Sequence, residues 1–212
     1  MRKIMPYKTS RNALLALDNG GRFYNIFTKA NDGNISAAEL AKVAGVLGDR
    51  QKMILYLEMS IINLEEKARQ EVYARLSDQL KSSLEKYIPQ HFVPSEAKEK
   101  ALTGSNAVIT GIPEFVESKT DFAGFVMVPI STGKSMSFIM VPIMDQYNIY
   151  KLRDKATDEE FFIAHDRSSF KFPEKTMRFG GVIKELQQDK EKKDNDSPQK
   201  FLEIYYYTEL SM

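Results

Sequence analysis

The sequence contains no cysteine among its 212 residues. Without cysteine the chain has no disulfide framework, no thiol nucleophile and no cysteine-ligated zinc or iron–sulfur site. This excludes a small secreted protein that depends on disulfides for stability. Hydrophobic residues make up 42% of the chain and charged residues 28%, which is typical of a globular protein with an apolar core.

Long apolar runs are also missing. No window approaches the roughly 18 apolar residues that a membrane span requires. A secretory signal would need a run of about 7–15 apolar residues near the N-terminus, but Pro6, Lys8 and Arg11 interrupt that stretch. We therefore expect a cytoplasmic protein without a membrane partner.

The chain lacks a large excess of charge of either sign, since its net charge is +1 at pH 7. Residues 1–107 contain 16 Lys and Arg against 12 Asp and Glu, a balance of +4, and residues 108–212 contain 14 against 17, a balance of −3. Neither half is charged enough to attract nucleic acid or an anionic membrane by bulk electrostatics. Nucleic acid is therefore a less favoured partner.

Two patterns of hydrophobicity divide the chain. Helical spacing of apolar residues extends from Ser10 to about Tyr87, whereas short apolar runs separated by turn residues follow Ser105. We therefore predict an α+β fold, with an N-terminal helical bundle over residues 1–104 and a small antiparallel β-barrel or sandwich over residues 105–212. Strands are expected at 125–130, 138–143, 147–152, 160–164, 177–186 and 201–208. Residues 187–199 are polar and predict a mobile loop.

A single apolar stripe follows the nearly all-apolar stretch Met53–Leu64, and charged residues flank it. One unbroken helix to Tyr87 would be about 57 Å long at 1.5 Å per residue, so we expect a break near Ser77–Asp78 or a partner for the stripe. An unpaired stripe predicts docking of another protein or self-association through the long helix. The stripe comprises Ala68, Val72, Leu76, Leu80 and Leu84.

Residues 28–39 read Thr-Lys-Ala-Asn-Asp-Gly-Asn-Ile-Ser-Ala-Ala-Glu. This segment resembles the twelve-residue calcium loop of the EF-hand superfamily, and the resemblance extends over about residues 21–48. Asp32 corresponds to loop position 5, Gly33 to position 6, Ile35 to position 8 and Glu39 to position 12. In the family the Gly makes a sharp turn and the final Glu binds calcium with both oxygens.

Two loop positions depart from that pattern. Thr28 at position 1 and Ala30 at position 3 replace the usual carboxylate or amide ligands, and Asn34 at position 7 offers only its backbone carbonyl. Calcium takes six to eight oxygen ligands, so we expect the helix-loop-helix shape without calcium, other metals or a cofactor. The same residues also fit a plain Asp-Gly turn followed by a Ser-x-x-Glu capping box.

Other motifs are weaker. Gly133-Lys134-Ser135 lacks the upstream glycine of a phosphate-binding loop and predicts a hairpin turn. His165-Asp166 and the isolated His91 form no catalytic triad or metal cluster by spacing. The paired glycines Gly180-Gly181 predict a bulge or a barrel corner.

The sequence favours a non-enzymatic protein–protein interaction or adaptor protein of unknown pathway. One alternative is a nucleic-acid- or ribosome-associated β-barrel protein. Its aromatic and basic residues would be Tyr147, Tyr150, Phe201, Tyr205, Tyr206 and Tyr207 with Lys151, Arg153, Lys171, Lys175 and Arg178. Another alternative is a small-molecule binder or enzyme with a pocket between the halves, using Asp145, Asp154, Asp166 or Glu174.

Overall fold

The structure is a computed structural model that describes residues 1–19, 30–116, 125–131, 136–154, 156–186 and 199–210. Residues 187–198 of the predicted loop and the predicted Gly133-Lys134-Ser135 turn lie outside these residues. Helices account for 35% of the chain and strands for 34%, so the prediction that the chain combines both kinds of element is confirmed.

The chain divides into two compact units. The helical unit contains residues 2–90 together with Tyr206–Thr208, and the β unit contains His91–Tyr205 with Met1 and the residues from Glu209 onward. The division at residue 90 differs from the predicted boundary at 104, because helix α7 (Pro94–Lys100) packs against strands β3 and β7 of the β unit. Strand β9 (Lys200–Glu209) contributes residues to both units.

The helical unit is built from short capped helices: α1 (Ser10–Leu17), α3 (Ala37–Ala44), α4 (Arg50–Ile61), α5 (Glu66–Ala74) and α6 (Asp78–Tyr87). The predicted capping box is confirmed at α3, where Glu39 N donates to Ser36 Oγ at 3.3 Å and Ser36 N donates to Glu39 Oε2 at 2.8 Å. Helix α3 ends at Gly45, whose φ of 70° is accessible to glycine at little cost. Strand β1 (Arg2–Lys3) pairs in parallel with residues 206–207 of β9.

The stretch from Met53 to Tyr87 is three helices, not one. The chain leaves the helix after Ile61 and again between Ala74 and Asp78. At the second break Ile35 N donates to Arg75 O at 2.7 Å and Ser77 N donates to Ile35 O at 2.9 Å, which forms a parallel β-bridge between Ile35 and Leu76. The expected break near Ser77–Asp78 is confirmed. Backbone pairing with Ile35, which is distant in the sequence, keeps residues 75–77 out of a helix.

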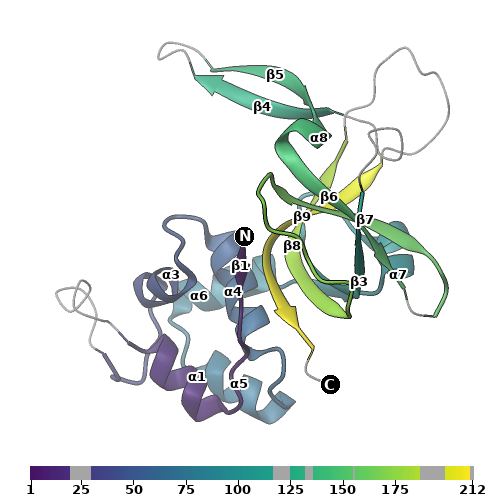
Figure 1. Cartoon of the computed structure of the whole chain (residues 1–212). Coiled ribbons are helices and arrows are strands. Elements are labelled where there is room, and N and C mark those ends of the chain that lie inside the picture. The colour runs from purple at the N-terminus through teal and green to yellow at the C-terminus, as the bar shows by residue number, and fades with distance from the viewer. Residues whose placement is uncertain (20–29, 117–124, 132–135, 155, 187–198, 211–212) are drawn as a thin grey trace. The chain divides into compact units, whose positions relative to one another are not determined.

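The β unit carries most of a mixed sheet (Figure 1). Its strands are β2 (Gln90–Phe92), β3 (Asn106–Phe115), β6 (Tyr147–Arg153), β7 (Glu160–Asp166), β8 (Met177–Glu185) and β9. Strand β3 is antiparallel to β6 and β8, and β6 is antiparallel to β7. Strand β7 is parallel to β9, and β8 also pairs with β9. The prediction of a purely antiparallel sheet is therefore wrong, because β9 enters beside β7 in the same direction.

Strands β4 (Phe125–Ser131) and β5 (Met136–Pro142) form a separate antiparallel ribbon (Figure 1). The ribbon lies in the chain between β3 and β6 and leads into the short helix α8 (Ile143–Gln146). The strands predicted at 125–130 and 138–143 are confirmed except at Ile143, which begins α8.

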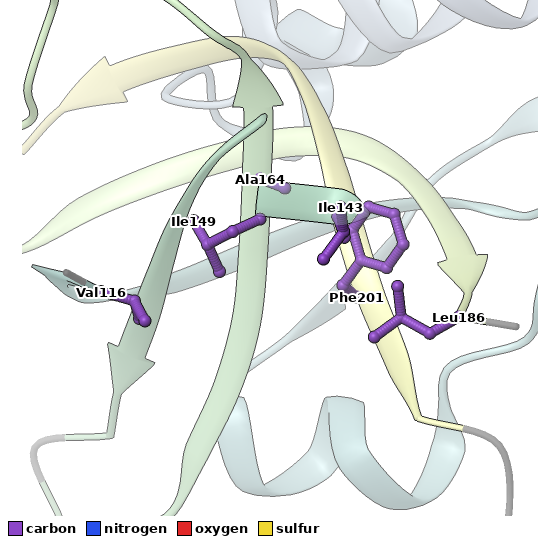
Figure 2. Close-up of a cluster of buried hydrophobic side chains, with 6 residues drawn as sticks. All are labelled: Val116, Ile143, Ile149, Ala164, Leu186 and Phe201. Atoms are coloured by element: carbon purple, nitrogen blue, oxygen red, sulfur yellow. The ribbon is translucent and has the colours of Figure 1, made fainter. Parts of the chain in front are cut away.

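One hydrophobic cluster of the β unit joins α8 to the strands. Figure 2 shows its six side chains, which come from the chain after β3 and β8, from α8 and from three neighbouring strands. Ile149 on β6 lies opposite Ala164 on β7, and Phe201 on β9 lies opposite Phe162, so these side chains share one face of the sheet. The cluster comprises Val116, Ile143, Ile149, Ala164, Leu186 and Phe201. Its burial fixes α8 against that face.

Candidate functional site

Residues 30–39, the described part of the loop that resembles a calcium site, do not gather metal ligands. Thr28 lies outside the described residues, and the Ala30 side chain has no oxygen. The Asp32 carboxylate accepts a hydrogen bond from Asn34 N at 2.9 Å and so forms part of the turn itself. Among the residues that the structure describes, no group of three or more His, Asp or Glu side chains is placed to hold a metal ion.

Glu39, the last residue of that loop, is buried with 1% of its surface exposed. Its Oε2 atom accepts hydrogen bonds from both the N–H and the hydroxyl of Ser36, each at 2.8 Å. The side chain therefore caps helix α3. Its second oxygen, Oε1, has no hydrogen-bond partner among the described residues.

The stripe predicted to dock a partner lies in the core of the helical unit. Val72 is 0% exposed, Leu76 2% and Leu80 1%, while Ala68 and Leu84 are partly buried. Other helices of the same unit cover these side chains, because α5 packs on α1 and α6 packs on α4. Val72, Leu76 and Leu80 are therefore inaccessible from the surface of the folded unit.

The aromatic residues considered for a nucleic-acid groove are also dispersed. Tyr150 is 0% exposed and Phe201 1%, so neither ring can stack on a base. Tyr206 and Tyr207 belong to the helical unit and are buried there. Tyr147 and Tyr205 are partly exposed.

The acidic side chains considered for catalysis do not converge. Asp145, Asp166 and Glu174 are exposed. Asp154 accepts hydrogen bonds from Ser95 Oγ at 3.0 Å and from Ala156 N at 2.9 Å. These bonds, the one from the Ala156 backbone foremost, lower the pKa of Asp154. Asp154 therefore stabilises a turn.

A hollow of about 340 Å³ lies where the end of β3, the start of β6 and the end of β7 meet. Val116 and Ile149 of the hydrophobic cluster in Figure 2 line it, together with Met144 of α8. Phe115 and Tyr147 are two further lining residues. With Asn148 and Arg167 the lining combines apolar and aromatic residues with a few polar groups, as ligand sites commonly do.

Hydrogen bonds fix the side chains of Tyr147 and Asn148, two residues that line the hollow. Tyr147 Oη donates to Glu203 Oε1 at 2.9 Å. Burial, with the Glu203 carboxylate beside the phenol, raises the pKa of Tyr147 above its usual range. Asn148, which also lines the hollow, donates from Nδ2 to Ser168 O at 2.7 Å. This bond ties the start of β6 to the segment that follows β7.

Residues 167–176, which connect β7 to β8, contribute one cation that lines the hollow, Arg167, and one that contacts a lining residue, Lys171. Arg167 lines the hollow and donates from Nη1 to Met144 O at 3.3 Å and from its backbone N to Gln146 O at 2.8 Å. The Lys171 ammonium lies 4.1 Å from the centre of the Phe115 ring. Cations beside aromatic rings are the groups that bind a phosphate next to a stacked base.

The two cations of β6, Lys151 and Arg153, are both paired with acidic side chains. Lys151 Nζ lies 3.4 Å from Glu160 Oε2, and Arg153 Nε lies 3.3 Å from Glu160 Oε1. Arg153 also pairs with Glu114. This part of the sheet surface is balanced in charge, which leaves Arg167 in the lining of the hollow and Lys171 over the Phe115 ring as cations for a ligand.

Sequence reasoning missed this hollow. Phe115, Tyr147 and Arg167 are separated by 20 or more residues in the chain, and no spacing rule joins them. The comparisons with known proteins add no assignment, because no protein-family model and no curated protein matches the chain. Within the described part of the chain, no helix has the length and hydrophobicity to cross a membrane.

Proposed function

We propose that the β unit binds single-stranded nucleic acid through a five-stranded barrel that resembles the OB-fold. The single observation that carries this proposal is the order of strand pairing. Strand β3 pairs with β6 and β8, β6 with β7, β7 with β9, and β9 with β8, so each of these five strands has two neighbours among the five. Strands β7 and β9 are the parallel pair.

If β3, β6, β7, β8 and β9 are numbered one to five in chain order, their order around the ring is one, two, three, five, four and back to one. Strand three is then parallel to strand five. That order and direction resemble the OB-fold, a Greek-key barrel that binds oligonucleotides and oligosaccharides with its second and third strands and the loops beside them. Those strands correspond to β6 and β7. The resemblance is an analogy of fold, so the chemistry of the hollow has to support it.

The chemistry of the hollow favours nucleic acid among the ligands of such barrels. Tyr147 offers a ring for stacking on a base, and Arg167, which also lines the hollow, offers positive charge for the phosphate beside it. Lys171, which lies over the Phe115 ring, offers a second positive charge. Stacking on an aromatic ring is worth about 1–3 kcal/mol per base and tolerates any sequence. We therefore infer binding with little preference for sequence.

The ion pairs of Lys151 and Arg153 limit the electrostatic contribution, because a phosphate would have to displace Glu160 or Glu114 to reach them. Arg167 and Lys171 can neutralise about two phosphates. For single strands the logarithm of the affinity falls with the logarithm of salt concentration with a slope of about −0.7 per phosphate. The expected slope is therefore about −1.4.

The test is the fluorescence anisotropy of a labelled oligothymidylate titrated with the full chain at several sodium chloride concentrations. We expect saturable binding that weakens with salt at the slope given above. The double variant Arg167→Ala, Lys171→Ala should lose most of the affinity. The control is Lys98→Ala, which removes an exposed lysine of α7 that pairs with Glu159. No binding at low salt, or equal loss in the control, would refute the proposal.

A second candidate, protein–protein interaction, is favoured by the β4–β5 ribbon. Its two strands contain no charged residue, and Ile139 and Met140 are 45% and 48% exposed. Exposed apolar surface of this kind is typical of interaction sites. Light scattering of the wild type and of Ile139→Lys tests self-association: a wild-type monomer would exclude self-association by the ribbon.

A further inference from the structure

His165 lies buried in the β unit, with 1% of its surface exposed. Its Nδ1 atom is 2.8 Å from Asp166 O, and only an Nδ1–H group can donate to that carbonyl. The neutral ring then carries its lone pair on Nε2. Nε2 is buried and has no hydrogen-bond partner among the described residues, so a proton added there would create a buried charge without an acceptor.

Aromatic rings enclose the imidazole. Tyr150 of β6 stacks on it with ring centres 5.7 Å apart, and Phe172 meets it edge-on at 5.4 Å. Phe170 lies 6.4 Å from it. Phe170 and Phe172 belong to residues 167–176, and Phe172 also packs on Phe179 of β8 at 4.8 Å. The segment 167–176 therefore covers His165.

The same segment carries Arg167, which lines the hollow, and Lys171, which lies over the Phe115 ring. Arg167 comes directly after Asp166, the residue whose carbonyl binds the His165 ring, and Lys171 lies between Phe170 and Phe172 in the chain. Asn148 joins the hollow to this segment through Ser168 O. A displacement of Phe170 and Phe172 would thus move Arg167 and Lys171 as well.

The charged and titratable groups near the ring do not stabilise an imidazolium strongly. Burial lowers the pKa of His165, and the positive chain N-terminus at Met1 lowers it further. The carbonyl and carboxylate of Asp166 oppose this in part. From the elements packed against the ring, the titratable group in contact with it is the phenol of Tyr150. Arg167 and Lys171 follow in the chain, with Arg167 bonded to Met144 O and Lys171 over the Phe115 ring.

We propose that protonation of His165 opens the segment 167–176 and thereby weakens the binding of single-stranded nucleic acid at the hollow. A buried cation without an acceptor has to reach water or lose its proton, and the segment that covers it connects two strands without being part of either. Coupling of this kind is reciprocal, so bound nucleic acid keeps His165 neutral. The effect on binding rests on the function proposed above, whereas the opening of the segment does not.

The first experiment compares oligothymidylate binding at pH 7.5 and pH 5.5 for the wild type, His165→Gln and His91→Gln. His91 is the only other histidine of the chain, so His91→Gln is the matched control. We expect the wild type and His91→Gln to bind about fivefold or more weakly at the lower pH, and His165→Gln to bind equally at both. An equal pH response in His165→Gln and the wild type would overturn the coupling.

The second experiment needs no nucleic acid. The protection factors of residues 167–176 against hydrogen exchange, in which each rate is corrected for the intrinsic pH dependence of amide exchange, should fall at pH 5.5 in the wild type and in His91→Gln but not in His165→Gln. If exchange behaves in this way while no variant binds oligothymidylate, the opening is supported and the proposed function fails. If the protection factors of this segment are the same at both pH values in the wild type, the inference itself is wrong.

Discussion

The carboxylate of Asp18 holds the backbone of Gly33. Oδ2 of Asp18 accepts the Gly33 N–H at 2.7 Å, and Oδ1 accepts the Asp32 N–H at 3.3 Å. Asp18 is the C-terminal cap of α1 and is only 6% exposed. A side chain from outside the loop thus organises the turn at residues 31–33, at the place where an EF-hand loop would fold around its ion.

We predict that Asp18→Ala lowers the free energy of unfolding of the helical unit by about 1–3 kcal/mol, since it leaves partly buried backbone N–H groups without an acceptor. Urea denaturation followed by circular dichroism at 222 nm measures the change. Asp32→Ala is the control, because Asp32 is exposed and caps only its own turn. An equal loss in both variants would contradict the special role of Asp18.

The second prediction concerns calcium. Calorimetric titration of the chelator-stripped protein with calcium, and then with magnesium, should give no binding heat up to millimolar metal. Asp32 and Glu39 are engaged in a turn and a helix cap, and Ala30 offers no side-chain ligand. Saturable binding in the micromolar range would show that this account of the loop is wrong.

The third prediction concerns a buried ion pair in the helical unit. Glu58 is 1% exposed and accepts hydrogen bonds from Arg69 Nη2 at 2.9 Å and from Tyr73 Oη at 2.8 Å. Burial raises the pKa of Glu58, against the opposing effect of these two partners. Arg69→Met should destabilise the unit by about 3–5 kcal/mol at pH 7, because an uncompensated buried charge remains.

The pH dependence of that variant follows from the same pKa. Loss of Arg69 raises the folded-state pKa of Glu58 further, so the folded state then binds more protons than the unfolded state above the ordinary value of 4.5. The destabilisation should therefore grow as pH rises above about 4.5 and shrink below it. Urea denaturation at pH 4 and pH 7 measures this. Lys67→Met, an exposed change on α5, should alter stability by less than about 0.5 kcal/mol at either pH.

The fourth prediction tests the close crossing of β8 and β9. A Cβ atom added to Gly181 would lie 2.1 Å from Glu203 O, a backbone atom that cannot move aside. Gly181→Ala should destabilise the β unit by about 3 kcal/mol or more. In the control Gly104→Ala, the added Cβ meets nothing within 4 Å and only the φ of 82° is unfavourable, which costs about 1–2 kcal/mol. Calorimetric unfolding that ranks the two equally would contradict a steric origin.

Sequence alone determined those features that depend on neighbours in the chain. The Ser36–Glu39 capping box was predictable because its groups are three residues apart, and Asp49 caps α4 for the same reason. Strands β6, β7, β8 and β9 lie where short apolar runs predict them. Strand β3 was not predicted as an element, since Gly111 and Pro113 interrupt its apolar pattern.

Only the tertiary structure decided which segments meet. The bridge between Ile35 and Leu76, the parallel pairing of β7 with β9, and the place of residues 206–208 in the helical unit join parts of the chain far apart in sequence. The stripe around Val72 was recognised as apolar, but its burial on other helices of the same unit was not. The periodicity of apolar residues indicates that one face of a helix is buried. Which element packs on that face depends on packing and hydrogen bonding across the whole fold.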